Sequence, residues 1–288
     1  MKTIQLDFIK TDGTIGVISF PIDSMTINLR NMDIYELDFS ALANFSNLSK
    51  LVLSRNNLVK LDLESLTECK ELEWLDLSHN SLLNIDLTPL MYHPSLQRFS
   101  LSYNPLHTID LGPISSIQCL ESIRLTRTYL EQIDLSPLQS LERLREFSIA
   151  FNALSHVVLD PLNTCSELRI LLLNRNQIRE IDLTSLSACR ELRILNLSDN
   201  QLNTVDLSPL AECSSLHSLV LGANNLSKID LRPLAELPSL NILDLSDNHL
   251  SYIELSVLSY LSDMQEVLLS GNPLSDDFIN DYSSYVLF

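Results

Sequence analysis

The segments LEWLDLSHNSL (residues 72–82) and LRILNLSDNQL (residues 192–202) decide the fold, because the pattern they share recurs along nearly the whole chain. With the first leucine as position 1, apolar residues stand at positions 1, 4, 6 and 11, and asparagine stands at position 9. Position 9 recurs ten times at intervals of 24 residues, as Asn56, Asn80, Asn104, Thr128, Asn152, Asn176, Asn200, Asn224, Asn248 and Asn272. A fixed period of this length predicts a tandem solenoid, in which each coil packs only against its neighbours.

Each repeat divides into two halves. Leucines at positions 4 and 6 alternate with polar residues at 3, 5 and 7, which predicts a strand buried on one side, and stacked strands make a parallel sheet. The asparagine carries both a donor and an acceptor, so we expect it to satisfy backbone groups where the chain leaves the strand. The second half, as in residues 205–213 (VDLSPLAEC), predicts a short helix or helical turn, with Ser208 as N-cap and Pro209 as first residue.

The frame L-x-x-L-x-L-x-x-N-x-L resembles the leucine-rich-repeat superfamily over about residues 24–288. The resemblance implies an α/β solenoid: a horseshoe with a concave parallel β-sheet and short helices or helical turns on the convex side. The I-D-L-S-P-L-x-x-C style of unit is similar to that of non-secreted prokaryotic proteins of this kind, archaeal ones among them.

The ends of the array require seals, because an open solenoid exposes its apolar layer. Alternating residues around Asp12-Gly13 predict a β-hairpin cap over residues 1–23. The array follows as one continuous domain of about 11 units over residues 24–274, in which the first unit is degenerate and carries Met32 in place of asparagine. Residues 275–288 predict a C-terminal capping helix, with Phe278, Tyr282 and Tyr285 over the last coil.

Composition limits the partners and the compartment. Because 37 acidic residues outnumber 19 basic ones, general binding to nucleic acid is disfavoured. The chain has no apolar run long enough for a membrane span, and residues 1–16 lack the apolar block of a secretion signal. Four of five cysteines fill one apolar position of the repeat and no cysteine cluster flanks the array, which favours a reducing compartment. We therefore expect a cytoplasmic protein with no membrane contact.

A column of acidic residues recurs at position 15. It holds Asp38, Asp62, Asp86, Asp110, Asp134, Asp182, Asp206, Asp230 and Glu254. We interpret these carboxylates as groups that order the turn before the helix. A calcium-binding ladder is the alternative, although the closely spaced glycines and aspartates of calcium-binding repeats are missing.

The concave positions 3, 5, 7, 8 and 10 are where the superfamily to which the resemblance points binds its partners. Arginine and aromatic residues, which dominate binding hot spots, gather there in the middle of the chain. The predicted contacts are Arg55, Trp74, His79, Arg98, Tyr103, Arg124, Arg127, Tyr129, Phe151 and Arg175. Ile170, Leu172 and Ile194 add an apolar spot beside Arg175. The alternative interpretation is that these side chains only solvate the sheet.

Catalysis finds little support in the sequence. The six histidines are scattered, and glycine loops for phosphate and nucleophile motifs are missing. We therefore expect a non-catalytic protein-binding scaffold without cofactor or metal, whose partner is a protein with an acidic surface. Two alternatives stay open: the targeting module of a larger enzyme or effector, and a binder of an acidic small molecule or polyanion.

Overall fold

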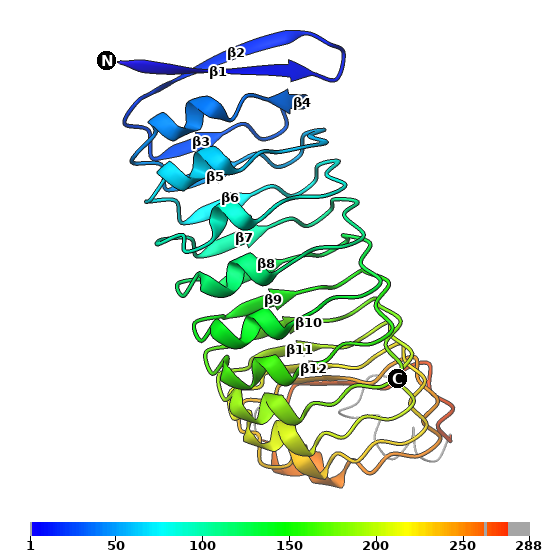
Figure 1. Ribbon diagram of the computed structural model, residues 1–288. Helices are drawn as coiled ribbons and strands as arrows, with labels where there is room; N and C mark the ends of the chain where they lie inside the picture. Colours follow the sequence, from blue (N-terminus) through cyan, green and yellow to red (C-terminus); the bar gives the residue numbers. More distant parts are fainter. Residues whose placement is uncertain (1, 262–263, 276–288) are drawn as a thin grey trace. The chain divides into compact units, whose positions relative to one another are not determined.

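The computed structural model describes residues 2–261 and 264–275 and divides into two compact units, Met1–Arg143 and Leu144–Phe288 (Figure 1). The C-terminal capping helix expected at residues 275–288, with Phe278, Tyr282 and Tyr285, lies outside the described residues except for Ser275.

The first unit begins with an antiparallel sheet in the order β2-β1-β4, formed by β1 (Thr3–Lys10), β2 (Ile15–Pro21) and β4 (Ile34–Leu37). The turn between β1 and β2 contains Gly13 with φ of +82°, a conformation open to glycine at little cost. The Asp12 carboxylate accepts the backbone N–H of Thr14 at 2.9 Å and fixes this turn. Leu6 and Phe8 of β1 are buried.

The repeats of the first unit form a parallel sheet of short strands, each joined to the next through a 3₁₀ turn. The strands are β3 (Thr26–Asn28), β5 (Lys50–Val52), β6 (Trp74–Asp76), β7 (Arg98–Ser100) and β8 (Ser122–Arg124). The turns are η1 (Ser40–Asn44), η2 (Glu64–Glu68), η3 (Thr88–Leu90), η4 (Gly112–Ser116) and η5 (Ser136–Ser140). Paired residues of neighbouring strands lie 24 apart in sequence, as the repeat period requires.

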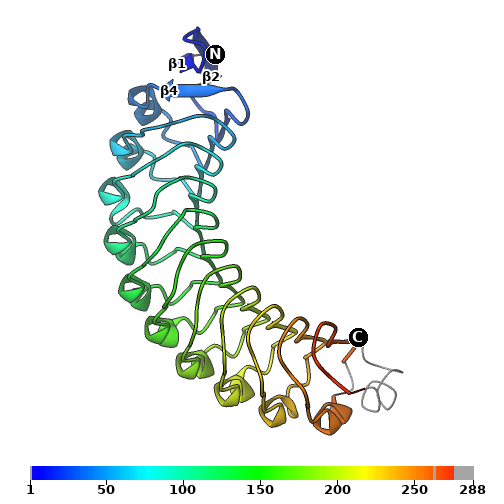
Figure 2. The same ribbon diagram turned by 90° about the vertical axis from the view of Figure 1, so that its right-hand side faces the viewer.

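The second unit continues the same plan. Its strands are β9 (Glu146–Ser148), β10 (Ile170–Leu172), β11 (Ile194–Asn196), β12 (Ser218–Val220), β13 (Ile242–Asp244) and β14 (Glu266–Leu268). Its turns are η6 (Asp160–Thr164), η7 (Thr184–Ala188), η8 (Ser208–Glu212), η9 (Arg232–Leu234) and η10 (Ser256–Tyr260). Figure 2 shows the turns of this unit on the outer side of its bend.

The asparagine of each repeat connects two coils, which explains its exact spacing. The Asn200 side-chain oxygen accepts the N–H of Ile178 at 3.0 Å, and its amide nitrogen donates to the carbonyls of Leu173 at 3.1 Å and Leu197 at 3.0 Å. The expectation that asparagine satisfies backbone groups of the turn is confirmed. The amide nitrogen also donates a longer bond of 3.3 Å to the Ser198 carbonyl of its own coil. Two of the four bonds reach back into the preceding coil, so the residue also joins neighbouring repeats.

The expected N-cap at position 17 is wrong. Ser208 is the first residue of η8, and the N-cap position belongs to Leu207, whose side chain makes no capping hydrogen bond. The cap comes from the acidic column instead, since the Asp206 carboxylate accepts the Ser208 N–H at 2.9 Å. All nine members of the column make the equivalent bond to the residue two positions on, which confirms that they order the turn.

The thiols of the cysteine column lie in the core as expected. Cys69, Cys165, Cys189 and Cys213 are buried, and burial raises the pKa of Cys189 to about 12 and that of the other three to about 11. These thiols are therefore protonated at neutral pH.

Candidate partner-binding face

Strand geometry sends the side chains of positions 3 and 5 to the side opposite the leucine core. Positions 7 and 8 continue this surface where the strand ends. We call the side chains at positions 3, 5, 7 and 8 of the repeats the strand face. It carries nine of the ten contact residues expected from the sequence, and Tyr129 follows it at position 10.

Every residue at position 8 has a left-handed backbone. The φ angles lie between 52° and 60° at the ten non-glycine residues and reach 71° at Gly271. The non-glycine residues are Asn31, Arg55, His79, Tyr103, Arg127, Phe151, Arg175, Asp199, Ala223 and Asp247. This conformation costs a non-glycine residue about 1–2 kcal/mol. It is held by the ladder, since the N–H of Tyr103, for example, donates to the Thr126 carbonyl at 2.7 Å.

The left-handed column was missed in the sequence, although a signal was present. Asn31, Asp199, Asp247 and Gly271 are residue types enriched at positive φ, and they share position 8 with the bulky side chains. Because the strained backbone is the same in every coil, it aims all these side chains out of the strand end in a common direction. Arginine and aromatic residues are thereby presented in register.

In the first unit, position 8 forms a stacked series. The rings of His79 and Tyr103 lie 3.9 Å apart and nearly parallel, and the Arg127 guanidinium lies 5.6 Å from the centre of the Tyr103 ring. Burial, and then the neighbouring Arg55 guanidinium, lowers the pKa of His79. A neutral imidazole at pH 7 stacks on the phenol without a desolvated charge.

A second series runs along position 3 of the same unit. The Lys50 ammonium lies 3.5 Å above the Trp74 ring, and the Arg98 guanidinium lies 5.8 Å from it on the neighbouring strand. Cation–π contacts at exposed sites are worth about 0.5–1 kcal/mol each. Trp74 is the only tryptophan of the chain, and it is held between two cations.

Arg124 and Tyr129 lie near these two series. Arg124 ends β8 and is exposed, as is Arg55. Tyr129 is also left-handed, with φ of 58°, and its ring packs at 5.6 Å on the ring of His107. His107 was not among the expected contacts because it stands at position 12, outside the positions assigned to the face. The structure thus groups eight of the ten expected residues in the first unit.

The second unit carries the other two residues, in a different setting. The Arg175 guanidinium lies 4.8 Å from the Phe151 ring and also 3.4 Å from the Asp199 carboxylate. Its charge is therefore partly neutralised. Ile170 and Ile194 are paired in register on β10 and β11, and both are half-buried on the strand face of this unit, as is Leu172.

The strand face of the first unit is basic, in contrast to the acidic chain. Its twenty positions, in the five repeats that begin at residues 24, 48, 72, 96 and 120, carry one carboxylate, Asp76, and six cations. The cations are Arg30, Lys50, Arg55, Arg98, Arg124 and Arg127. The strand face of the second unit carries five carboxylates and one cation: Glu146, Asp199, Asp244, Asp247, Glu266 and Arg175.

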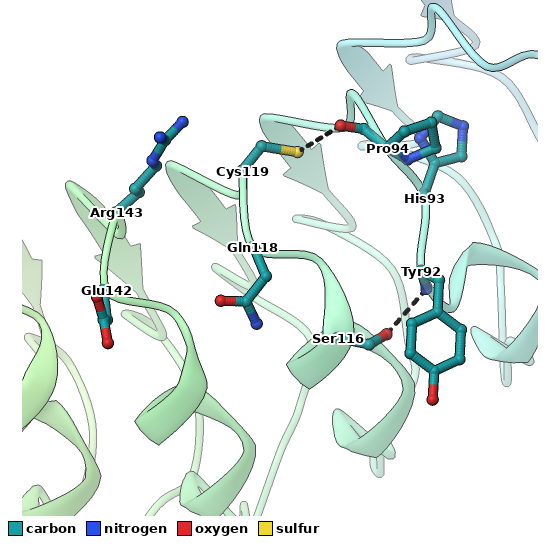
Figure 3. Close-up of a pocket in the computed structure, with 8 residues that line it drawn as sticks. All are labelled: Tyr92, His93, Pro94, Ser116, Gln118, Cys119, Glu142 and Arg143. Atoms are coloured by element: carbon teal, nitrogen blue, oxygen red, sulfur yellow. Dashed lines mark hydrogen bonds between the residues drawn. The ribbon is translucent and has the colours of Figure 1, made fainter.

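A separate groove of about 510 Å³ opens on the turn side of the first unit (Figure 3). The groove lies beside η3, which has three residues where η2 and η4 have five, and Tyr92 after it is left-handed with φ of 59°. The Tyr92 N–H donates to the Ser116 hydroxyl at 2.9 Å, and the Cys119 thiol donates to the Pro94 carbonyl at 3.3 Å. Burial raises the pKa of the Cys119 thiol, so this thiol is not activated as a nucleophile.

The described part of the chain holds no group of three or more His, Cys, Asp or Glu side chains placed to bind a metal. None of its helical segments has the length and apolar character that a membrane crossing requires.

Two family models, each described as a leucine rich repeat, match the sequence, one over residues 25–82 and 214–274 and the other over residues 191–213. No curated protein matches the chain.

Solved structures resemble the chain at low sequence identity. An internalin (inlF) from Listeria monocytogenes has a TM-score of 0.67 at 23% identity, over 92% of this chain and 80% of its own. A leucine-rich-repeat protein from Leptospira interrogans has a TM-score of 0.61 at 20% identity, over 86% and 74%. The ectodomain of the plant membrane receptor kinase GASSHO1/SCHENGEN3 from Arabidopsis thaliana, in complex with CASPARIAN STRIP INTEGRITY FACTOR 2, has a TM-score of 0.65 at 23% identity, over 97% of this chain and 30% of that one. These identities establish likeness of fold alone.

Proposed function

Because this chain belongs to the leucine-rich-repeat superfamily, as its repeat frame predicted, we propose that it is a non-catalytic scaffold that binds an acidic partner protein through the strand face of its first unit. Proteins of this superfamily are generally interaction scaffolds, and the predicted fold class of the chain, parallel strands backed by helical turns, is confirmed. The receptor kinase ectodomain that resembles the chain was solved in complex with CASPARIAN STRIP INTEGRITY FACTOR 2. That likeness supports the general class of function.

The single observation that supports the acidic partner is the charge of the strand face. Six cations and one carboxylate stand there, in a chain whose formal charge is −18. Trp74 and Tyr103 hold several of these cations over their rings, which limits the side-chain motion that binding would otherwise have to freeze. A complementary carboxylate surface would be steered to this face and would pair with guanidinium groups on arrival.

Affinity capture from cell extract tests the proposal. Arg124→Glu/Arg127→Glu reverses two charges of the face, and Lys70→Glu/Arg143→Glu makes the same change in net charge at exposed positions away from the strands. We expect the first pair to lose the captured partner and the second to keep it, with circular dichroism confirming that both fold. An identical set of captured proteins from both variants would refute the proposed face.

An acidic small molecule or polyanion is the second candidate, and the same six cations favour it. A polyglutamate or inositol phosphate that raises the melting temperature of the wild type, but not of Arg124→Glu/Arg127→Glu, would support this candidate if no protein is captured. The role of targeting module for a larger enzyme or effector is compatible with either ligand.

We propose in addition that the protein works in the cytoplasm and without a catalytic centre. Four buried thiols with raised pKa values support a structural role for the cysteines in a reducing compartment. Fractionation of native cells with an antibody to the chain tests the location. Recovery with the secreted or surface fraction would contradict it.

A further inference from the structure

The outer edge of β2 is a free edge of the N-terminal sheet. The sheet order is β2-β1-β4, and no strand in the described part of the chain pairs with the other side of β2. Figure 1 shows β2 as the outermost strand of this sheet. A free edge presents backbone donors and acceptors to any strand that can reach it.

The register of the hairpin identifies the groups that point outward. The N–H of Lys10 donates to Thr14 and the N–H of Ile22 donates to Lys2, each at 2.9 Å, so the hydrogen-bonded pairs fall on the even-numbered residues of β2. Antiparallel strands alternate these pairs with pairs whose backbone groups point away. The residues with outward backbone groups are Ile15, Val17, Ser19 and Pro21, and Pro21 has no N–H to offer.

This edge lacks the devices that usually prevent association. The strand Ile15–Pro21 contains no charged residue, and the side chains of Ile15 and Val17 are 75% and 54% exposed. Proline stands only at its last position. In contrast, β14 at the other end of the array has three residues and carries Glu266. Short length and charge protect an edge, and β2 has neither.

We propose that β2 pairs antiparallel with β2 of a second copy of this chain, about a two-fold axis at Val17. This register sets Val17 opposite Val17 of the second copy, and Ile15 opposite Ser19 of the second copy. All three outward N–H groups then find a carbonyl. Pro21, which lacks an N–H, falls opposite Gly13 in the turn, beyond the paired segment.

Charge favours an identical strand at this place. The first 23 residues carry two cations and three carboxylates, and none of these five charges lies in β2. Because β2 itself carries no charge, two acidic molecules can approach edge to edge here without like charges meeting along the paired strands. No charge in β2 meets its own copy across the axis. The Val17 side chains meet there as an apolar cross-strand pair.

Sedimentation equilibrium tests the pairing. We expect the wild type to dimerise, Val17→Lys to be monomeric because two lysines would meet on the axis, and Gln5→Lys to dimerise. Gln5 is exposed on β1, opposite Ser19, so its change adds the same charge one strand away from the edge. A wild type that is monomeric at its highest soluble concentration, or a Val17→Lys dimer, would overturn the proposal.

Crosslinking tests the register and does not depend on a destabilising change. In a Cys119→Ser background, Val17→Cys places two thiols across a hydrogen-bonded pair, where Cα atoms stand about 5.5 Å apart and a disulfide can close. The matched variant Ser19→Cys separates its two thiols by four residues along the strands, or about 13 Å. Mild oxidation with diamide should therefore give a covalent dimer with Val17→Cys and none with Ser19→Cys. The reverse result, or equal crosslinking, would refute the two-fold register.

Discussion

Replacing Asn200 with alanine should destabilise the array through one orphaned amide and two weakened carbonyls. The side chain is 8% exposed and is the only partner of the buried Ile178 N–H among the described contacts. The carbonyls of Leu173 and Leu197 each keep a second donor, from Asn176 and Asn224 respectively. The variant therefore leaves one donor without a partner and removes one of two bonds at each of these carbonyls. It also removes the longer bond of 3.3 Å to the Ser198 carbonyl, which keeps the Arg175 N–H and adds little to the cost.

The magnitude follows from those three groups. A buried N–H left unsatisfied costs about 1–3 kcal/mol, and each lost bond to a carbonyl costs about 0.5–1.5 kcal/mol. We expect Asn200→Ala to lower the free energy of unfolding by about 2–6 kcal/mol. The control Asn203→Ala lies at an exposed position of the same coil and should change it by less than about 0.5 kcal/mol.

Two measurements decide the matter. Urea unfolding followed by circular dichroism gives the free-energy difference, and amide hydrogen exchange reports the local effect, which is useful because repeat arrays can depart from two-state unfolding. The Ile178 amide should exchange faster in Asn200→Ala, while amides in the coil of Asn56 should not change. A loss below about 1 kcal/mol with unchanged protection of Ile178 would refute the reasoning.

Three further results are expected. Ala223→Gly should raise the free energy of unfolding, measured in urea, by about 0.5–1 kcal/mol. Glycine removes the strain of the left-handed φ of 53°, but its greater backbone entropy in the unfolded state offsets part of that stabilisation. A less stable variant would contradict this expectation. Hydrogen bonds from Ser208 hold the pKa of Asp206 below 3.8, and the Arg232 guanidinium lowers the pKa of Asp230 to about 2. The stability that these two carboxylates add to the folded state is therefore complete above pH 3.8 and is lost as the pH falls towards 2. Carboxyl carbon NMR should show Asp230 titrating near pH 2. The folded protein at pH 8 should show one slowly reactive thiol, Cys119, towards Ellman's reagent, and the unfolded protein five; rapid reaction of Cys189 in the folded state would count against its burial.

The features that repeat at fixed spacing could be predicted from the sequence, because each follows from a residue type whose chemistry has few alternatives. Asparagine at position 9 and leucine at positions 4 and 6 are examples, and the resulting sheet register of 24 follows directly. The serine at position 17 misled the prediction, because a residue with good N-cap chemistry stood next to an aspartate that does the capping. Which of the two residues caps the turn depends on where the turn of five residues begins, and the residue types alone do not determine that start.

The site was predictable only in part. Its residues and their side of the sheet follow from strand alternation, but the contacts between them depend on χ angles and on the left-handed backbone. The stacking of His79 on Tyr103 could not be predicted without knowing that both residues have nearly the same left-handed φ. The contact of His107 with Tyr129 and the groove beside Tyr92 occur where the chain departs from the repeat, so the repeat pattern could not predict them.

The left-handed column at position 8 also bears on how such a surface can change over evolution. Its backbone is imposed by bonds that involve no side chain, so arginine, phenylalanine, aspartate and alanine all occur there in this one chain with nearly the same φ. Exchanging one of these residues changes the surface that a binding partner contacts and leaves the backbone of the coil unchanged. Natural selection or protein engineering could therefore change the binding specificity of the array one coil at a time without changing its fold.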